Sequence, residues 1–454
     1  MTSRNLPPEP DSDAAQGTDT KTLRKDVATY GGFTVLRSSV SLITLPILVH
    51  TLSQAEYAAL DLLNISVALF TLMIPQLNAG FSRHYFQDRT ASEQARYVAT
   101  LFWTYAAVCG GVALVSVAVI AMGAFGLLPA IPSAQSAAIL AIAALPCLIL
   151  FEFFLLLLRL NRRRQEFIIL GLGEAVFRGL ASAGLLMLTG TVFGYFAGVF
   201  LSVALMTVFV YLKERIWTAK PDWAVLRRIL RFVLPVYPGL VGSYISRYAT
   251  RFLVLSWVTL EQLAVYVVAA KFAIMAKFFA QALSLSWTPI AMRLLAIDAS
   301  RSKVFFSSAL TGYALSSLFG VLAIGLLAAP LIDIIAPDGY AHSKALVPII
   351  AAGFLISGGG TILNIGNQAS ERTYWQSIAE ISGSIAALLV LYALVGQLGT
   401  QALAISLMVS AIVSCLVRIF GGQRHFAIAY QPWSVLLLLA GIPACALGLS
   451  LLYQ

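Results

Sequence analysis

Long apolar runs separated by short polar breaks fill the chain from about residue 27 to its end. A helix needs roughly 20 apolar residues to cross the hydrocarbon core of a bilayer. Thirteen runs approach or exceed this length, and they span 27–50, 57–80, 97–124, 136–160, 167–189, 192–213, 227–259, 262–290, 303–329, 344–367, 373–395, 400–420 and 431–452. The pattern predicts an all-α polytopic membrane protein. Residues 1–26 are polar and proline-rich, which predicts a disordered tail.

Composition supports this class and excludes several others. The 454 residues are 59% hydrophobic and 11% charged, whereas an ordinary soluble protein is about 25% charged. The four cysteines lie in apolar runs without metal-site spacing, and no nucleotide-binding or zinc-protease motif occurs. We therefore expect no cofactor, no metal, no enzymatic activity and no nucleic-acid partner.

Basic residues gather in the tail and in alternate connections. These segments hold 23 of the 30 basic residues, in groups at positions 4–25, 83–96, 159–164, 213–231, 293–303, 372 and 418–424. The positive-inside rule places basic loops in the cytoplasm. The N-terminus is therefore expected to be cytoplasmic, and thirteen spans would leave the C-terminus outside.

A weak internal repeat divides the chain into two halves. Thr51-Leu52-Ser53-Gln54, followed by Tyr57, is similar to Thr259-Leu260-Glu261-Gln262, followed by Tyr266. Both turns fall on the predicted outer side, which indicates two parallel six-helix bundles with a central cavity. The expected parts are a cytoplasmic tail (1–26), an N-lobe (27–213), a cytoplasmic linker (214–226), a C-lobe (227–424) and an extra C-terminal helix (425–454).

Six basic side chains lie inside the apolar runs: Arg37, Arg178, Arg247, Arg251, Lys271 and Lys277. A charge at the bilayer centre costs about 2.5–3.5 kcal/mol even on the gentlest scale, so such residues usually face a wet cavity or a partner. Arg247 and Arg251 share a helical face, with Tyr244 and Tyr248 on or beside it. Arginine pairs suit phosphate oxygens and tyrosines suit sugars. These residues are therefore predicted to bind an anionic substrate.

Alternatives remain for several of these positions. The arginines can instead pair with acids on other helices, and Arg178 can pair with Glu174 one turn earlier. Lys271 and Lys277 are six residues apart and point in different directions, which favours Lys271 as the cavity residue. Four intramembrane acids can couple transport to protons or pair structurally with basic residues: Glu152, Glu174, Glu380 and Asp61.

Several segments resemble the Wzx-type polysaccharide flippases of the multidrug/oligosaccharidyl-lipid/polysaccharide exporter superfamily. They are residues 45–57, 234–252 and 266–271, Trp287-Thr288-Pro289, and the stretch from Tyr340 to Pro348. The resemblance covers about residues 25–430. One departure is that Thr250 precedes Arg251, where related chains often carry an acid.

The resemblance implies a transporter in the bacterial inner membrane that flips undecaprenyl-diphosphate-linked oligosaccharides. It also implies alternating access of the two lobes and coupling to a proton or sodium gradient or to the membrane potential. The implied partners are the lipid-linked oligosaccharide, the bilayer and a glycan polymerase or export machinery. Three other functions stay open: a cationic-drug exporter, a membrane glycan polymerase, and a structural scaffold.

The orientation is testable by cysteine labelling in intact cells. We expect positions 162–164 and Lys220 to be protected from a membrane-impermeant thiol reagent, and Glu261 and Asp338 to react when replaced by cysteine. Labelling of position 163 from outside would contradict both the orientation and the division into two parallel halves.

Overall fold

A computed structural model describes the molecule at residues 36–37, 40, 42–72, 74, 77–78, 81, 91–121, 132–161, 163–214, 221–234, 237–244, 248, 250–297, 299–370, 372 and 374–453. Regular structure in these ranges is helical, without a strand. Ten of the helices are long and apolar enough to cross a membrane. The predicted fold class, an all-α multi-pass membrane protein, is therefore confirmed.

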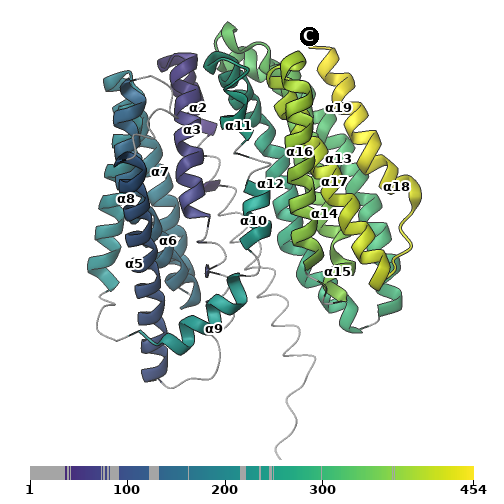
Figure 1. Ribbon diagram of the computed structural model, residues 1–454, viewed down its shortest axis with the longest axis horizontal. Coiled ribbons are helices and arrows are strands. Elements are labelled where there is room, and N and C mark those ends of the chain that lie inside the picture. Colours follow the sequence, from purple (N-terminus) through teal and green to yellow (C-terminus); the bar gives the residue numbers. More distant parts are fainter. Residues whose placement is uncertain are drawn as a thin grey trace, which may run out of the picture.

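The helices form two groups that stand side by side (Figure 1). The N-lobe contains α2 (Leu45–Thr51), α3 (Gln54–Thr71), α5 (Ala91–Ala121), α6 (Pro132–Leu160), α7 (Arg164–Thr189) and α8 (Val192–Glu214). The C-lobe contains α10 (Tyr237–Tyr244), α11 (Thr250–Val254), α12 (Leu260–Ile297), α13 (Ala299–Ile335), η4 (Asp338–Tyr340), α14 (Ser343–Leu363), α15 (Ile365–Ala369), α16 (Tyr374–Leu398) and α17 (Thr400–His425).

The final apolar run packs against the C-lobe as α18 (Pro432–Leu436), a π-helical turn η5 (Leu437–Gly441) and α19 (Ile442–Leu451). The C-terminus lies at the same end of the molecule as the α2–α3 turn (Figure 1). We call this the Ser53 end, and the opposite end, which carries the α6–α7 turn, the Arg163 end.

The run 227–259 is not one helix, which corrects the sequence-based prediction. Its first residues belong to α9 (Trp223–Val233), which is strongly inclined to the spanning helices, and α10 and α11 follow (Figure 1). Pro235 lies between α9 and α10, and proline lacks the N–H that would continue a helix. Pro238, by contrast, falls in the first turn of α10, where proline is tolerated.

The two halves begin their long inner helices with the same capping chemistry. The Ser53 hydroxyl accepts a hydrogen bond from the Glu56 backbone N–H, and the Ser53 N–H donates to the Glu56 carboxylate. At the start of α12 the same exchange joins Thr259 and Gln262. Such caps contribute about 1 kcal/mol each. By this capping, Ser53 in the first half is equivalent to Thr259 in the second half. The sequence repeat had aligned Thr51 with Thr259, which is two residues earlier in the first half.

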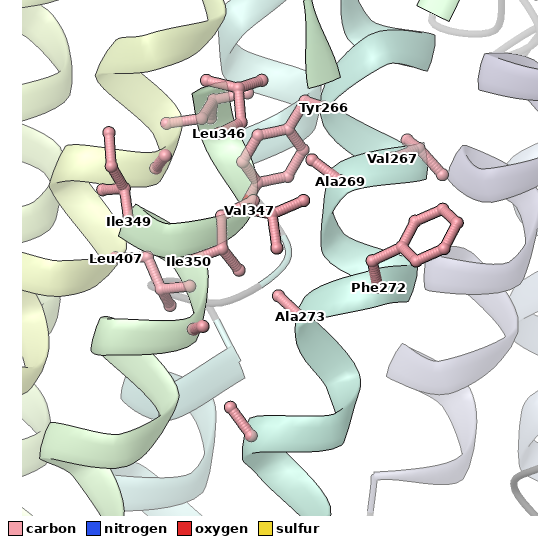
Figure 2. Close-up of a cluster of buried hydrophobic side chains, with 14 of the residues drawn as sticks. Tyr266, Val267, Ala269, Phe272, Ala273, Leu346, Val347, Ile349, Ile350 and Leu407 are labelled. Carbon is pink, nitrogen blue, oxygen red and sulfur yellow. The ribbon is translucent and has the colours of Figure 1, made fainter. Parts of the chain in front are cut away.

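Small residues let the C-lobe helices approach closely. On α12, Ala269 and Ala273 lie on the side of α14, next to Val347 and Ile350 (Figure 2). Helix association in lipid depends on this kind of close van der Waals packing, because lipid is as apolar as the side chains. Phe272 projects from the opposite side of α12 toward the N-lobe (Figure 2). Helix α12 is therefore the wall that the C-lobe presents to its partner lobe.

Glycine sets the contact between α7 and α8. Gly190 ends α7 with φ of 66°, in the left-handed region that glycine adopts without strain. Eight residues later, a Cβ at position 198 would lie 2.4 Å from backbone atoms of Ser182. The two helices can pack at this distance only because residue 198 has no side chain.

We expect Gly198→Leu to force α7 and α8 apart and to destabilise the protein by about 1–3 kcal/mol, the usual cost of overpacking. Gly184→Leu is the matched control, because a Cβ there meets nothing within 4 Å. The measurement is the thermal unfolding midpoint of each purified variant in the same detergent. Equal midpoints for the two variants would contradict the close contact.

Candidate functional site

Two adjoining cavities lie on the inner side of the N-lobe. The first, about 200 Å³, which we call the central cavity, is bounded by both lobes, with Val267 and Lys271 contributed by α12. The second, about 620 Å³, which we call the Glu152 cavity, is bounded by α3, α6 and α7. Three polar side chains line both: Arg37, Asn64 and Arg178.

Helix α3 supplies a polar stripe to these walls. Tyr57, Asp61 and Asn64 line the central cavity, and Thr71 continues the stripe into the Glu152 cavity. Their spacings of four, three and seven residues place all of them on one helical face. The buried residues Leu62 and Leu63 do not line either cavity. The amphipathic pattern of α3 therefore builds one side of the site.

Arg37 joins the cavity to two carboxylates. Its guanidinium lies 2.9 Å from the Glu152 carboxylate and 3.3 Å from that of Glu174. Arg178 lies 3.0 Å from Glu174 through its Nε, which confirms the predicted pair four residues apart. The Glu174 oxygen in that contact accepts no well-aligned hydrogen bond, so the contact is chiefly electrostatic. The fully buried Glu174 side chain thus holds two arginines at the cavity wall.

Lys271 faces the same cavity from the opposite lobe. It is half-buried on α12 and lines the central cavity together with Arg37 and Arg178. Among the described residues no carboxylate lies within ion-pair distance of its ammonium group. Four basic side chains line the two cavities, against the acids Asp61 and Glu152. Positive charge is therefore in excess, and Lys271 in the central cavity and Arg159 in the Glu152 cavity have no carboxylate partner among the described residues.

Arg251 is placed differently from the sequence-based prediction. It does not line either cavity but pairs with Asp61, and both side chains are nearly buried. Its guanidinium also lies 5.1 Å from the centre of the Tyr266 ring, a cation–π contact. Because α3 belongs to the N-lobe and α11 to the C-lobe, this pair joins the two lobes. A buried arginine needs such a partner, and Asp61 supplies it.

Tyr244 forms a contact between the lobes. Its hydroxyl donates a 2.6 Å hydrogen bond to the Ile65 carbonyl on α3, and its role in substrate binding stays a prediction. The Tyr248 ring lies 5.4 Å from that of Tyr244. Neither tyrosine lines the two cavities. Arg247 lies outside the described residues.

Further contacts close the Ser53 end. The Gln54 side chain donates to the Gly339 carbonyl at 2.8 Å, and the rings of Tyr57 and Tyr340 meet edge to face at 6.2 Å. Burial raises the pKa of Tyr340 to about 12, further above physiological pH than that of an exposed tyrosine. These contacts and the Asp61 pair all involve the first half of α3. The second half of α3 lines the Glu152 cavity instead. These contacts therefore close the molecule at the Ser53 end.

The remaining predicted residues are apart from the cavities. Lys277 is half-buried on α12 and lines neither cavity. Glu380, a predicted coupling residue, pairs with Arg418 between α16 and α17 inside the C-lobe. Its carboxylate is thus part of the packing of that lobe rather than of the cavity walls.

Cavity residues missed at the level of sequence include Tyr57, Asn64, Arg159 and Tyr195. The signal for Asn64 was present, because it follows Asp61 by three residues on the same face of a helix. Tyr195 gave no comparable signal. It lies on α8 and reaches the cavity only because α8 packs beside α3 and α7.

Comparison with solved structures identifies the fold. The chain is similar to the lipid II flippase MurJ in an inward closed conformation (TM-score 0.64, 11% identity, 92% of this chain and 98% of that one). It is also similar to a multidrug resistance MATE family transporter of the MOP superfamily in an inward-facing conformation (TM-score 0.64, 14% identity, 86% and 94%). A third match is the Vibrio cholerae MATE transporter VcmN in its bent form (TM-score 0.59, 15% identity, 93% and 99%).

No protein-family model and no curated protein sequence matches the chain. At 11–15% identity the structural likeness establishes the two-lobed fold and nothing finer. The resemblance to Wzx-type flippases therefore stays a prediction. The fold likeness extends to an outward-facing MATE structure (TM-score 0.61).

We expect the Asp61–Arg251 pair to hold the Ser53 end shut. Asp61→Asn or Arg251→Gln leaves a buried charge unpaired, a change that typically costs about 3–5 kcal/mol. The distance between spin labels at the exposed positions 50 and 338 should therefore broaden toward longer values. The measurement is pulsed electron resonance in a background without the four native cysteines.

The double variant Asp61→Asn/Arg251→Gln removes both charges and should return toward the wild-type distance. Asp333→Asn is the control, because it breaks a surface pair with Lys344 and leaves the lobe contact intact. Unchanged distances in both single variants would show that the pair does not hold the lobes together.

Proposed function

We propose that this protein is a transporter that flips an anionic, diphosphate-linked lipid oligosaccharide across the bacterial inner membrane. The Arg163 end faces the cytoplasm, as the distribution of basic residues predicts. In this state the substrate enters from the cytoplasmic side, because the lobes are closed at the Ser53 end. The two-lobed fold, shared with a flippase and with MATE transporters, supports movement of one lobe against the other.

The charge distribution at the cavities carries this proposal. Each described carboxylate there already has an arginine partner: Asp61 has Arg251, and Glu152 and Glu174 share Arg37. Lys271 has no such partner in the described part of the chain. In this cavity the acids are neutralised by arginines, whereas the lysine is not neutralised by an acid. Such a cavity is suited to an anion.

The substrate's diphosphate would take the place of the carboxylates around Arg37 and Arg178. Arginine binds phosphate oxygens in the same two-pronged geometry as it binds carboxylates. Each charge-assisted hydrogen bond contributes about 1.5–3 kcal/mol. Because Lys271 belongs to the C-lobe and the arginines to the N-lobe, a diphosphate bound to all three would connect the lobes. Binding would thereby favour movement of one lobe relative to the other.

The glycan and the lipid tail need different surroundings. Together the cavities hold a volume in the range typical of small-ligand sites, about 300–1,000 Å³, which accommodates the diphosphate and the nearest sugar. Tyr57, Tyr195 and Asn64 at the wall supply rings and an amide for sugar hydroxyls. The apolar tail would remain in the bilayer, where it avoids contact with the charged cavity wall.

Ion coupling would act through the same carboxylates. A proton on Glu174 would release Arg178 and would leave Arg37 with Glu152 as its one carboxylate partner among the described residues, so both arginines could turn more readily to phosphate. A proton on Asp61 would release Arg251 and loosen the Ser53 end. These steps make Glu174 and Asp61 the coupling residues of the proposal, and Glu380 has no such role because it lies within the C-lobe.

A cationic-drug exporter is the second proposed function, and the MATE-like fold and the three acids near the cavity favour it. It requires at least one of Asp61, Glu152 and Glu174 to exchange its arginine for the drug. The two proposals therefore predict opposite roles for Lys271: attraction of an anionic substrate, or repulsion of a cationic one.

The flippase proposal predicts that Arg37→Ala and Lys271→Ala each reduce flipping at least about tenfold, because each removes a charged contact to the diphosphate. Arg37→Lys should keep part of the activity, since lysine keeps the positive charge but cannot bind phosphate in the bidentate geometry of arginine. Lys344→Ala is the control, because it removes a lysine outside the cavities. The assay is flipping of a fluorescent diphosphate-linked lipid by protein reconstituted in vesicles.

Normal flipping by both alanine variants at wild-type protein levels would contradict this proposal. Faster export of a cationic drug by Lys271→Ala would support the second one. Glu174→Gln separates coupling from structure. We expect flipping by this variant to lose its pH dependence, whereas an acid that is only structural would lower stability and leave the pH profile unchanged.

A further inference from the structure

Helix α9 has one face fixed to the N-lobe. The residue before the helix is Asp222, and its backbone N–H donates a 2.8 Å hydrogen bond to the Thr100 hydroxyl on α5. The Asp222 carboxylate accepts hydrogen bonds from the backbone N–H groups of Ala224 and Val225 and so caps the helix. Ile229 is fully buried in the aromatic core of the N-lobe, with Val225 packed against the same cluster. The helix is therefore docked on protein through its apolar side.

The other face of α9 is cationic and exposed. Arg227, Arg228 and Arg231 are exposed, and Trp223 is 74% exposed. Trp223, Arg227 and Arg231 follow at four-residue spacing, so they share a face, with Arg228 beside them. Together with Ala224 they line a shallow hollow of about 520 Å³. No carboxylate in the described ranges lies within ion-pair distance of the three guanidinium groups.

The position of α9 narrows the choice of ligand. It lies at the Arg163 end and is inclined across the bundle rather than along it (Figure 1). Under the proposed orientation this is the level of the cytoplasmic headgroups. Arginine binds phosphate bidentately, and tryptophan prefers the boundary between headgroups and hydrocarbon. A soluble polyanion would account for the arginines but not for a tryptophan exposed beside them.

We propose that the face formed by Trp223, Arg227, Arg228 and Arg231 binds the phosphate groups of anionic phospholipids in the cytoplasmic leaflet. The inference rests on the orientation in the proposed function but not on the transported substrate. Because α9 connects the lobes in sequence and is docked on the N-lobe, lipid binding would anchor the N-lobe at the membrane surface. The C-lobe would then be the lobe that moves.

The test uses the whole protein in bilayers that contain a fixed share of brominated lipid, either phosphatidylglycerol or phosphatidylcholine. Bromine quenches tryptophan at short range, and the difference between wild type and Trp223→Phe isolates the Trp223 signal. We expect stronger quenching by brominated phosphatidylglycerol, an effect that weakens at high salt. Each arginine contributes up to about fivefold to the lipid preference.

Replacing the three arginines by glutamine should abolish the preference, whereas replacing them by lysine should retain most of it. Arg372→Gln is the control, because it removes an exposed charge at the same end outside α9. Equal quenching of wild type by the two lipids, or a preference that survives the glutamine variant, would overturn the proposal. Reduced flipping by the glutamine variant without any lipid preference would assign the face to the substrate's own phosphate, which also overturns it. No substrate is present during the quenching measurement. The lipid preference can therefore be interpreted even if the flippase proposal is wrong.

Discussion

The need to pair charged side chains inside an apolar interior is the constraint on which the rest of this structure depends. An isolated charge at the bilayer centre costs several kcal/mol, and four arginines on the described helices or packed against them have carboxylate partners: Arg37, Arg178, Arg251 and Arg418. Each pair also fixes helices in space. Glu174 holds Arg37 and Arg178 at the cavity, Arg251 ties the C-lobe to Asp61 of the N-lobe, and Arg418 joins α17 to α16.

Under the proposed function, the same pairs would allow the molecule to switch between states. A packed apolar contact has no alternative partner, whereas an arginine can exchange one anion for another at little net cost if both are well placed. In the proposed mechanism Arg37 and Arg178 would pass from carboxylate to phosphate, and Arg251 would be released when Asp61 is neutralised. Lys271, which lacks a carboxylate partner in the described structure, is where the proposed anion would gain most.

The helices in this fold could largely be predicted from sequence, because apolar length alone specifies a spanning segment. The Glu174–Arg178 pair was predictable for a similar reason, since helical geometry brings residues four apart together. The Asp61–Arg251 pair was not, because its members are 190 residues apart and meet only through the packing of two lobes. The division of 227–259 was missed because its apolar composition hid the effect of Pro235.

The most direct test of the central claim is a structure of the purified protein with a diphosphate-linked lipid oligosaccharide bound. We expect phosphate density within ion-pair distance of Lys271 and of Arg37 or Arg178, with Glu152 or Glu174 displaced from its arginine. Density for the diphosphate elsewhere, with the Arg37–Glu174 and Arg178–Glu174 contacts intact, would contradict the account.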